Sequence, residues 1–277
     1  MIDSCRGLIL RETTYGDNDL IVNVLTVEHG KISVRCRGVR SLRSPYRNII
    51  HPLFYNQFEL YEKNGMYTLK EAGCLQSFYR IGMDIVRLSL AQYILEAANA
   101  VSVEGLEQDS LLQLCLNTLY AVTEKELPCD PVKAAFELRA MCVCGFMPDI
   151  SSCTVCGEER FPVFLDTVQG VLWCGDCLDR ARQEERERRR KQKEGSVTVG
   201  DDLTEADDGE SALPQNLRVL SPTVLRAMRY IVSCPPARIF SFSIPKDEQR
   251  QLSAVCEQYF LHQTDCRFQA LAFYKSL

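Results

Sequence analysis

The sequence predicts a multidomain protein, with an all-β barrel or sandwich at the N-terminus followed by an all-α helical domain that carries a four-cysteine zinc motif. Polar and apolar residues alternate near the N-terminus, helical spacing takes over at about residue 81, and two C-x-x-C pairs interrupt the helical part. The boundaries that we expect are 1–80 for the barrel, 81–150 for the first helical part, 151–182 for the zinc motif, 183–215 for a charged insertion and 216–277 for the second helical part.

Period-two alternation predicts strands in the first 80 residues. In KISVRCRGV, Ile32, Val34 and Cys36 face one way, and Lys31, Ser33, Arg35 and Arg37 face the other. A second alternating run places Phe54, Asn56, Phe58 and Leu60 on one side. It leads into Asn64-Gly65, a pair typical of a two-residue hairpin turn. Short strands without intervening helices predict a small barrel or sandwich.

Helical spacing begins at about residue 81. The first helix is apolar on two faces, which predicts that it lies between other helices; the faces carry Val86, Leu90, Tyr93 and Ala97, and Ile81, Ile85, Leu88 and Leu95. Asp109 is predicted to cap the next helix, and Pro131 suits the start of a third. Ser221 and Pro222 predict the cap and first residue of a later helix. A last helix carries Leu252, Val255 and Tyr259.

Composition and charge narrow the class of protein. The chain has 277 residues, a net charge of -5 and no apolar run as long as the roughly 18 residues of a membrane helix. Its N-terminus lacks the basic start and apolar stretch of a signal peptide, so we expect a cytoplasmic protein. The fourteen cysteines are then expected to stay reduced or to bind metal, with Cys115, Cys142, Cys144 and Cys256 as small buried apolar residues.

The stretch 183–215 is almost free of large apolar residues and changes from mostly basic to acidic. Such a composition cannot offset the entropy of ordering, so we expect a solvated insertion, with a fraying helix at its start. Its basic run, Arg186 to Lys193, predicts either a solvated charged face or a nucleic-acid contact.

Cys153, Cys156, Cys174 and Cys177 form two C-x-x-C pairs separated by seventeen residues, the spacing of a zinc site built from two turns. Gly157 and Gly175 stand where tight turns need glycine, and the segment PVFLDTVQGVLW predicts a hairpin that brings the pairs together. Four thiolates complete the coordination of Zn²⁺ and leave no position for a reactive water, so the site is expected to be structural. A redox pair or four unconnected cysteines are the alternatives.

A locally basic segment comprises the predicted strand KISVRCRGV and the loop that follows it. No acidic residue occurs from Gly30 to Phe58, and the cations are Lys31, Arg35, Arg37, Arg40, Arg43 and Arg47. Tyr46 lies among them as a candidate for stacking on a base. The segment predicts either a groove for single-stranded nucleic acid or a solvated face whose arginines pair with acids elsewhere.

Over most of its length, the sequence resembles the RecO family of bacterial recombinational repair proteins. The resemblance rests on GLILRETTYGDNDLIVNVLTVEHGKISVRCRGVRSLRS, on the G-F-x-P-x-x-x-x-C-x-x-C junction and on GVLWCGDC and LSPTVLRAMRYIV. The loop RSLRSPYR has fewer lysines than the family pattern, and the charged insertion is longer.

The resemblance implies an oligonucleotide-binding (OB) fold for the barrel and a zinc motif in the helical domain. It implies binding to single- and double-stranded DNA, strand annealing, and loading of RecA onto strands coated by single-strand-binding protein, together with RecR. The six basic residues then become candidate DNA contacts, the four cysteines hold one structural Zn²⁺, and the protein is expected at the nucleoid. No catalytic residue is implied.

Two other classes compete with this hypothesis. An enzyme has little support, because His29, His51 and His262 are scattered and no phosphate-binding glycine loop is present. The second is a zinc-containing adaptor or transcription-associated protein whose barrel binds protein in place of DNA. Binding of labelled oligonucleotide separates that class from the DNA-binding one.

Overall fold

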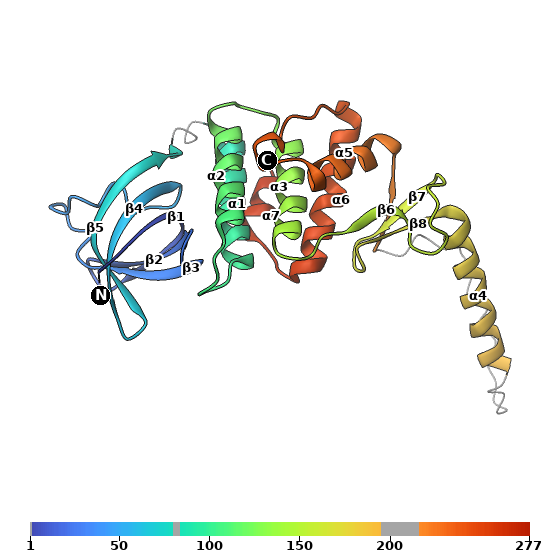
Figure 1. The fold of residues 1–277 in the computed structure, drawn as a ribbon, viewed down its shortest axis with the longest axis horizontal. Coiled ribbons are helices and arrows are strands. Elements are labelled where there is room, and N and C mark those ends of the chain that lie inside the picture. The colour runs from blue at the N-terminus through green and yellow to red at the C-terminus, as the bar shows by residue number, and fades with distance from the viewer. Residues whose placement is uncertain (1, 80–83, 195–215) are drawn as a thin grey trace.

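The fold is that of a computed structural model, which describes residues 2–79, 84–194 and 216–277. Figure 1 shows three parts in a row along the longest axis: a strand barrel, a helical bundle, and a small sheet from which a long helix projects. The N-terminus lies on the barrel and the C-terminus on the helical bundle. The barrel and the small sheet are therefore at opposite ends of the molecule.

The barrel consists of five strands. They are β1 (Ile2–Tyr15), β2 (Asp19–Thr26), β3 (Lys31–Cys36), β4 (Phe54–Lys63) and β5 (Met66–Ser77). The closed order is β1-β2-β3-β5-β4, in which the β3–β5 pair is parallel and the other strand pairs are antiparallel. A closed five-stranded barrel with β5 between β3 and β4 is an OB-fold, so the fold expected for the N-terminal part is confirmed.

The apolar residues of the alternating runs point into the barrel and form its core. Val34 and Cys36 are fully buried in a barrel core that also includes Phe58 and Leu60. The β4–β5 turn has positive φ at Asn64 (51°) and Gly65 (75°), as a tight two-residue hairpin requires. The predicted strands and hairpin are thus present.

The helical part comprises α1 (Ile85–Val101), α2 (Asp109–Thr123), α3 (Cys129–Val143), α5 (Pro222–Ser233), the 3₁₀ turn η2 (Pro236–Arg238), α6 (Lys246–Thr264) and α7 (Gln269–Lys275). Ser221 caps α5 as predicted, accepting a hydrogen bond from the N–H of Val224. The prediction for Asp109 is wrong: α2 begins at Asp109, and the preceding residue takes the cap position without a side-chain hydrogen bond. The first turn of α1 is also less buried than predicted, with Ile85 53% exposed.

A buried ion-pair network joins four helices. The Lys133 ammonium on α3 lies 2.9 Å from Glu137 on the same helix and 2.8 Å from Glu257 on α6. The Tyr93 hydroxyl on α1 donates to Glu137 at 2.7 Å, and Lys275 on α7 reaches Glu257 at 2.5 Å. Lys133 and Glu137 are almost fully buried, so each depends on its partners for compensation of its charge.

The barrel is attached to the bundle at the end of α1. Asn99 on α1 accepts a hydrogen bond from the Asn23 side chain through Oδ1 and one from Lys31 Nζ through its backbone carbonyl, both at 3.0 Å. Beside them, Gly30 has a φ of 61°, and a Cβ there would overlap the carbonyl oxygens of Val103 and Leu106. The close approach of the two parts therefore requires glycine at this position.

The cysteine region forms a sheet larger than the predicted hairpin. Its strands are β6 (Asp149–Cys153), β7 (Val163–Asp166), β8 (Val171–Cys174) and β9 (Leu217–Leu220), in the order β6-β8-β7-β9. The β7–β8 hairpin is as predicted, whereas β6 and β9 were not predicted. Helix α4 (Gly175–Glu194) follows β8 and points away from the molecule (Figure 1). It includes the first part of the predicted insertion; residues 195–215 lie outside the described residues.

Candidate nucleic-acid interface and metal centre

The six cations predicted to contact DNA lie on β3 and on the loop that follows it. The side chains of Arg37, Arg40, Arg43 and Arg47 are exposed, whereas Lys31 and Arg35 are half-buried. Four of the six predicted DNA contacts are thus exposed and two are not. The difference arises because Lys31 and Arg35 are bound by other groups of the protein.

Lys31 does not share an open surface with the loop arginines. Its ammonium donates to the Asn99 carbonyl, and its backbone N–H donates to the Val103 carbonyl at 3.1 Å. Both acceptors belong to the helical part, so this end of β3 faces α1. Lys31 holds the barrel against the bundle.

Arg35 is paired with an acid, as one of the two interpretations of the basic segment expected. Its guanidinium lies 2.8 Å from the Asp19 carboxylate and 4.9 Å from the centre of the Tyr15 ring. The other Asp19 oxygen accepts from the Gly38 N–H at 2.9 Å. This N–H, and then Arg35, hold the pKa of Asp19 below its ordinary value. Asp19 thus anchors the start of the β3–β4 loop.

The side chains of three loop arginines have no hydrogen-bond or ion-pair partner among the described residues, and we call them uncommitted. They are Arg37, Arg43 and Arg47. Arg40 donates only to a backbone carbonyl, that of Asp17, at 3.1 Å. These guanidinium groups remain free to bind an anion. Tyr46, the candidate for stacking on a base, is half-buried and packs against the barrel core, so only part of its ring is open to a base.

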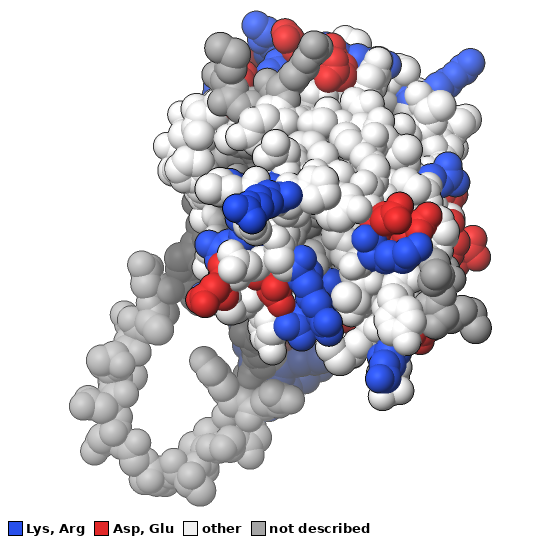
Figure 2. All heavy atoms as spheres, turned by 90° about the vertical axis from the view of Figure 1, so that its left-hand side faces the viewer, with Lys and Arg blue, Asp and Glu red and all other residues white. Residues whose placement is uncertain are grey.

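Figure 2 shows the barrel end of the molecule, the left-hand side of Figure 1. Its lysine and arginine side chains form separate groups, and acidic side chains adjoin some of them. The surface is therefore a set of cationic points on a mixed background, which suits contacts to individual phosphates better than a continuous basic track.

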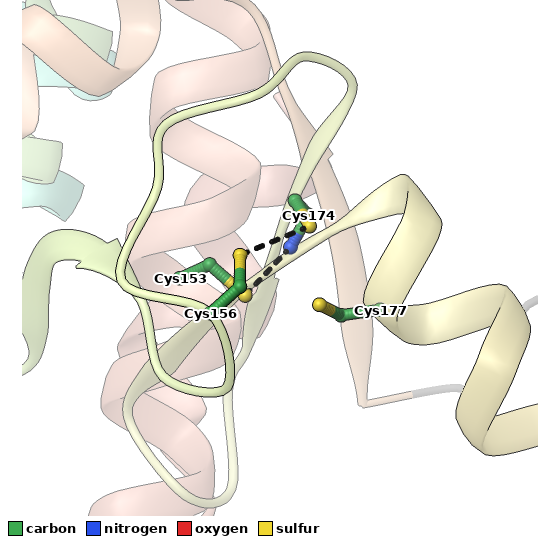
Figure 3. Close-up of side chains that lie close together, drawn as sticks. All are labelled: Cys153, Cys156, Cys174 and Cys177. Carbon is green, nitrogen blue, oxygen red and sulfur yellow. Dashed lines mark hydrogen bonds between the residues drawn. The ribbon is translucent and has the colours of Figure 1, made fainter.

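The predicted cysteines meet in one place. The four Sγ atoms of Cys153, Cys156, Cys174 and Cys177 all lie within 4.8 Å of one another. Cys156 Sγ is 3.7 Å from Cys174 Sγ, and the Cys174 N–H points at Cys153 Sγ at 3.3 Å (Figure 3). Zn–S bonds of about 2.3 Å in a tetrahedron give S–S edges of about 3.8 Å. The cluster can hold a metal ion, and the alternative of four unconnected cysteines is wrong.

Local geometry explains how the two pairs converge. After β6, Gly157 takes a φ of 72° and its N–H bonds to the Cys153 carbonyl at 2.9 Å, which closes the first turn. At the second pair, a Cβ on Gly175 would lie 3.2 Å from Cγ of Pro162, so the chain passes close to the β7 segment there. Cys177 lies in the first turn of α4. A tight turn therefore requires glycine at Gly157, whereas at Gly175, which has no positive φ, only the nearby Pro162 favours it.

The surroundings of Cys153 favour a thiolate. Burial raises the pKa of this thiol, but the N–H groups of Cys156, Cys174 and Val155 outweigh it and lower the pKa to about 6. Burial at Cys174, and the hydrogen bond with Cys174 at Cys177, raise the pKa of these two thiols, so they lose their protons only when a metal binds. Four soft sulfur ligands in a tetrahedral cluster fit Zn²⁺. The donor set therefore fits the metal that the spacing predicts.

Comparison with known proteins identifies the family. Residues 1–78 match the family model for the N-terminal part of recombination protein O, and residues 82–192 match the model for its C-terminal part. This chain belongs to the RecO family. It is 26% identical over 272 residues to DNA repair protein RecO of Acetivibrio thermocellus, covering 98% of this chain and 95% of that relative.

Two further relatives agree. The chain is 30% identical over 178 residues to DNA repair protein RecO of Alkaliphilus metalliredigens, covering 64% of this chain and 72% of the relative. It is 32% identical over 174 residues to DNA repair protein RecO of Exiguobacterium sibiricum, covering 63% of this chain and 70% of that relative. The resemblance seen in the sequence is thus confirmed for this RecO chain.

Among the described residues, no helix is long and apolar enough to cross a membrane.

Two residues that organise the site were not identified from the sequence. Asp19 holds Arg35 and the loop, and Asn99 holds Lys31. Each acts on a residue 16 to 68 positions away in the chain, so no local pattern marks it. Asp19 lies just after a G-D-N turn, which predicts a strand boundary but no partner.

Proposed function

We propose that this chain is a DNA-binding and strand-annealing recombination mediator in DNA repair, which acts with RecR to load RecA on single-stranded DNA coated by single-strand-binding protein. Membership of the RecO family supports the role in repair and recombination. The observation that carries the DNA contact is the group of uncommitted arginines on the β3–β4 loop of an OB-fold barrel.

The chemistry of annealing suits such a surface. Two strands repel each other through their phosphates, and guanidinium groups neutralise that charge without binding the base edges that must pair. Among the six predicted cations we assign the phosphate contacts to Arg37, Arg40, Arg43 and Arg47. Lys31 and Arg35 serve this surface indirectly, because they hold the barrel and the loop in place.

The cysteine cluster binds one structural Zn²⁺ in this proposal. Four thiolates close the coordination sphere, so the ion holds β6, β8 and α4 together and offers no position to a substrate or water. The cluster lies at the opposite end of the molecule from the barrel (Figure 1). The metal therefore supports the fold of the distal part and takes no part in reading DNA.

The remaining expectations follow from this role. The protein acts without catalysing a reaction, in the cytoplasm at the nucleoid, and binds both single- and double-stranded DNA. Contacts with RecR and single-strand-binding protein belong to the same proposal, and RecA is reached indirectly.

A charge-reversal experiment tests the proposal. We compare R37E/R43E/R47E with the control R226E/K246E/R250E, which changes the net charge equally at exposed positions of α5 and α6. Annealing of complementary oligonucleotides should be lost in the loop variant and retained in the control. For single strands, the log–log salt slope should be about -3 for the wild type and about 2 less steep for the loop variant.

The competing function is that of an adaptor whose barrel binds protein. Under that function, wild-type protein would show no salt-dependent retention of labelled oligonucleotide on a filter, and the loop variant would anneal no worse than the control. Either result would remove the proposed DNA contact.

A further inference from the structure

A crevice separates the barrel from the helical bundle. It has a volume of about 490 Å³ and is lined by β1, the segment before β4, one face of α1 and the link between α6 and α7. Its charged side chains are Arg11, Glu12, Glu96 and Arg267. Their formal charges cancel, so the character of the crevice depends on which of them are already paired.

Both acids are committed to contacts within the protein. The Glu12 carboxylate accepts from His51 Nδ1 at 2.7 Å. The Glu96 carboxylate accepts from two backbone N–H groups at the start of α7, at 3.1 and 2.9 Å. Neither carboxylate forms an ion pair with Arg11 or Arg267 within the described residues, although each keeps its negative charge.

Both arginines are exposed and uncommitted. Neither Arg11 nor Arg267 makes a hydrogen bond or ion pair to any residue that the structure describes. The backbone of Arg267 is nevertheless fixed, because the next residue, Phe268, is buried with its ring 5.6 Å from that of Tyr93. Two guanidinium groups therefore flank the crevice without a carboxylate paired to either of them.

Strand register connects this crevice with the β3–β4 loop. Directly paired residues of antiparallel strands share one face of the sheet. Across β1, β2 and β3 the paired rows are Arg11–Asn23–Ser33 and Thr13–Ile21–Arg35. Arg11 and Arg35 therefore lie on the same outer face. Arg37, the first residue after β3, is four positions beyond Ser33, which corresponds to roughly 13 Å at 3.3 Å per residue.

We propose that the crevice binds phosphates of a nucleic-acid strand whose path runs from the β3–β4 loop across the outer face of β1–β2–β3, with Arg11 and Arg267 as the contacts. This proposal rests on the proposed function and extends it, because it adds the helical part of the chain to the DNA-binding surface. Guanidinium groups suit this task, since their paired N–H donors match two oxygens of one phosphate. Exposed amides of the crevice, such as Gln92, add neutral donors.

The observations favour a nucleic-acid backbone over an acidic peptide. The two arginines continue a surface that already carries the loop arginines, and a repeating phosphate backbone bridges cationic points separated by such distances. An acidic peptide would need only the crevice itself. The experiment distinguishes the two, because only a strand couples the crevice to the loop.

The test uses the full chain with R11E/R267E and R11Q/R267Q; the second variant removes both charges without adding repulsion. R226E/R250E is the control of equal charge change at exposed helix positions. Fluorescence anisotropy with a single strand of about 16 nucleotides, the upper site size of one OB-fold, should show at least tenfold weaker binding for R11E/R267E. With four loop contacts and two crevice contacts, the wild-type salt slope for this longer strand should be about -4, and both crevice variants should show a slope less steep by about 1.4. With about 4 nucleotides the loss should be smaller.

The outcomes separate this proposal from the function on which it rests. If R37E/R43E/R47E weakens binding while both crevice variants bind the longer strand with unchanged affinity and slope, the crevice proposal is wrong and the proposed function stands. If neither set weakens binding, both fail. Unchanged DNA binding together with loss of binding to a synthetic acidic peptide would assign the crevice to protein and overturn the proposal. Thermal melting checks folding, and the glutamine variant decides the result if the glutamate variant melts early.

Discussion

The guanidinium of Arg35 and the carboxylate of Asp19 form an ion pair of 2.8 Å on the outer face of the barrel. The same carboxylate receives the Gly38 N–H, so one acid fixes both β3 and the first residues of the basic loop. Arg35, which the sequence predicts to contact DNA, therefore pairs with an acid and helps to hold the strand and the loop in place. The arginines beyond it on the loop are the ones left to bind an anion.

We predict that Asp19→Ala loosens the loop without unfolding the barrel. The Gly38 N–H loses its acceptor, so its hydrogen exchange should accelerate, and affinity for single strands should fall because the loop arginines are no longer held together. Asp17→Ala is the control, since Asp17 contributes only its backbone carbonyl to Arg40. Equal exchange at Gly38 in the two variants would contradict the assigned role of Asp19.

The buried ammonium of Lys133 should be essential to the helical bundle. Lys133→Met removes the cation that Glu137 and Glu257 share, and breaking this buried pair costs about 3–5 kcal/mol of unfolding free energy above pH 7, where Glu137 is ionised. Chemical denaturation measures the loss. Lys246→Met, at an exposed position of α6, should change the free energy of unfolding by less than about 0.5 kcal/mol. A similar small effect at Lys133 would mean that the network contributes little.

Glu137 should make stability depend on pH. Burial raises the pKa of its carboxyl from 4.5 to about 7, although Lys133 and Tyr93 act in the opposite direction. Between these values the native state binds more protons at this group than the unfolded state does, so its contribution to stability falls as pH rises from about 4.5 to 7.

Glu137→Gln should remove that contribution. The difference in unfolding free energy between wild type and variant, measured at several pH values, should therefore change across this window and stay constant above it. A difference that does not vary with pH would show that Glu137 has the same pKa in both states.

Purified protein should contain about one zinc per chain. Cys153→Ser and Cys174→Ser should lose the metal, because each removes a thiolate from the cluster, and Cys74→Ser, an exposed cysteine of β5, should keep it. Binding of zinc contributes on the order of 10 kcal/mol to folding of small structural sites, so removal should open the sheet β6-β8-β7-β9 to hydrogen exchange. The barrel, at the other end of the molecule, should keep its protection. Metal-free protein with a protected sheet would overturn the zinc assignment.

Much of the fold could be predicted because its signals are local. Alternation marks β3 and β4, Asn64-Gly65 marks the β4–β5 hairpin, and Ser221 marks the start of α5. Strands β6 and β9 could not be predicted in the same way. Each has only four or five residues, and β9 joins β7 across a gap of about fifty positions, so its sequence carries no sign of its partner.

The candidate site divides in the same manner. The sequence by itself determined the β-strands of the N-terminal part, the four cysteines that cluster and the concentration of cations from Lys31 to Arg47, since these depend on spacing and residue type. The OB-fold was implied by the resemblance to the RecO family. Only the tertiary structure decided which cations are free. Asp19 and Asn99 engage Arg35 and Lys31 from other elements, and the fold brings Arg11 and Arg267 to one crevice from positions 256 residues apart. Charge pairing depends on distance in space, which local sequence patterns do not record.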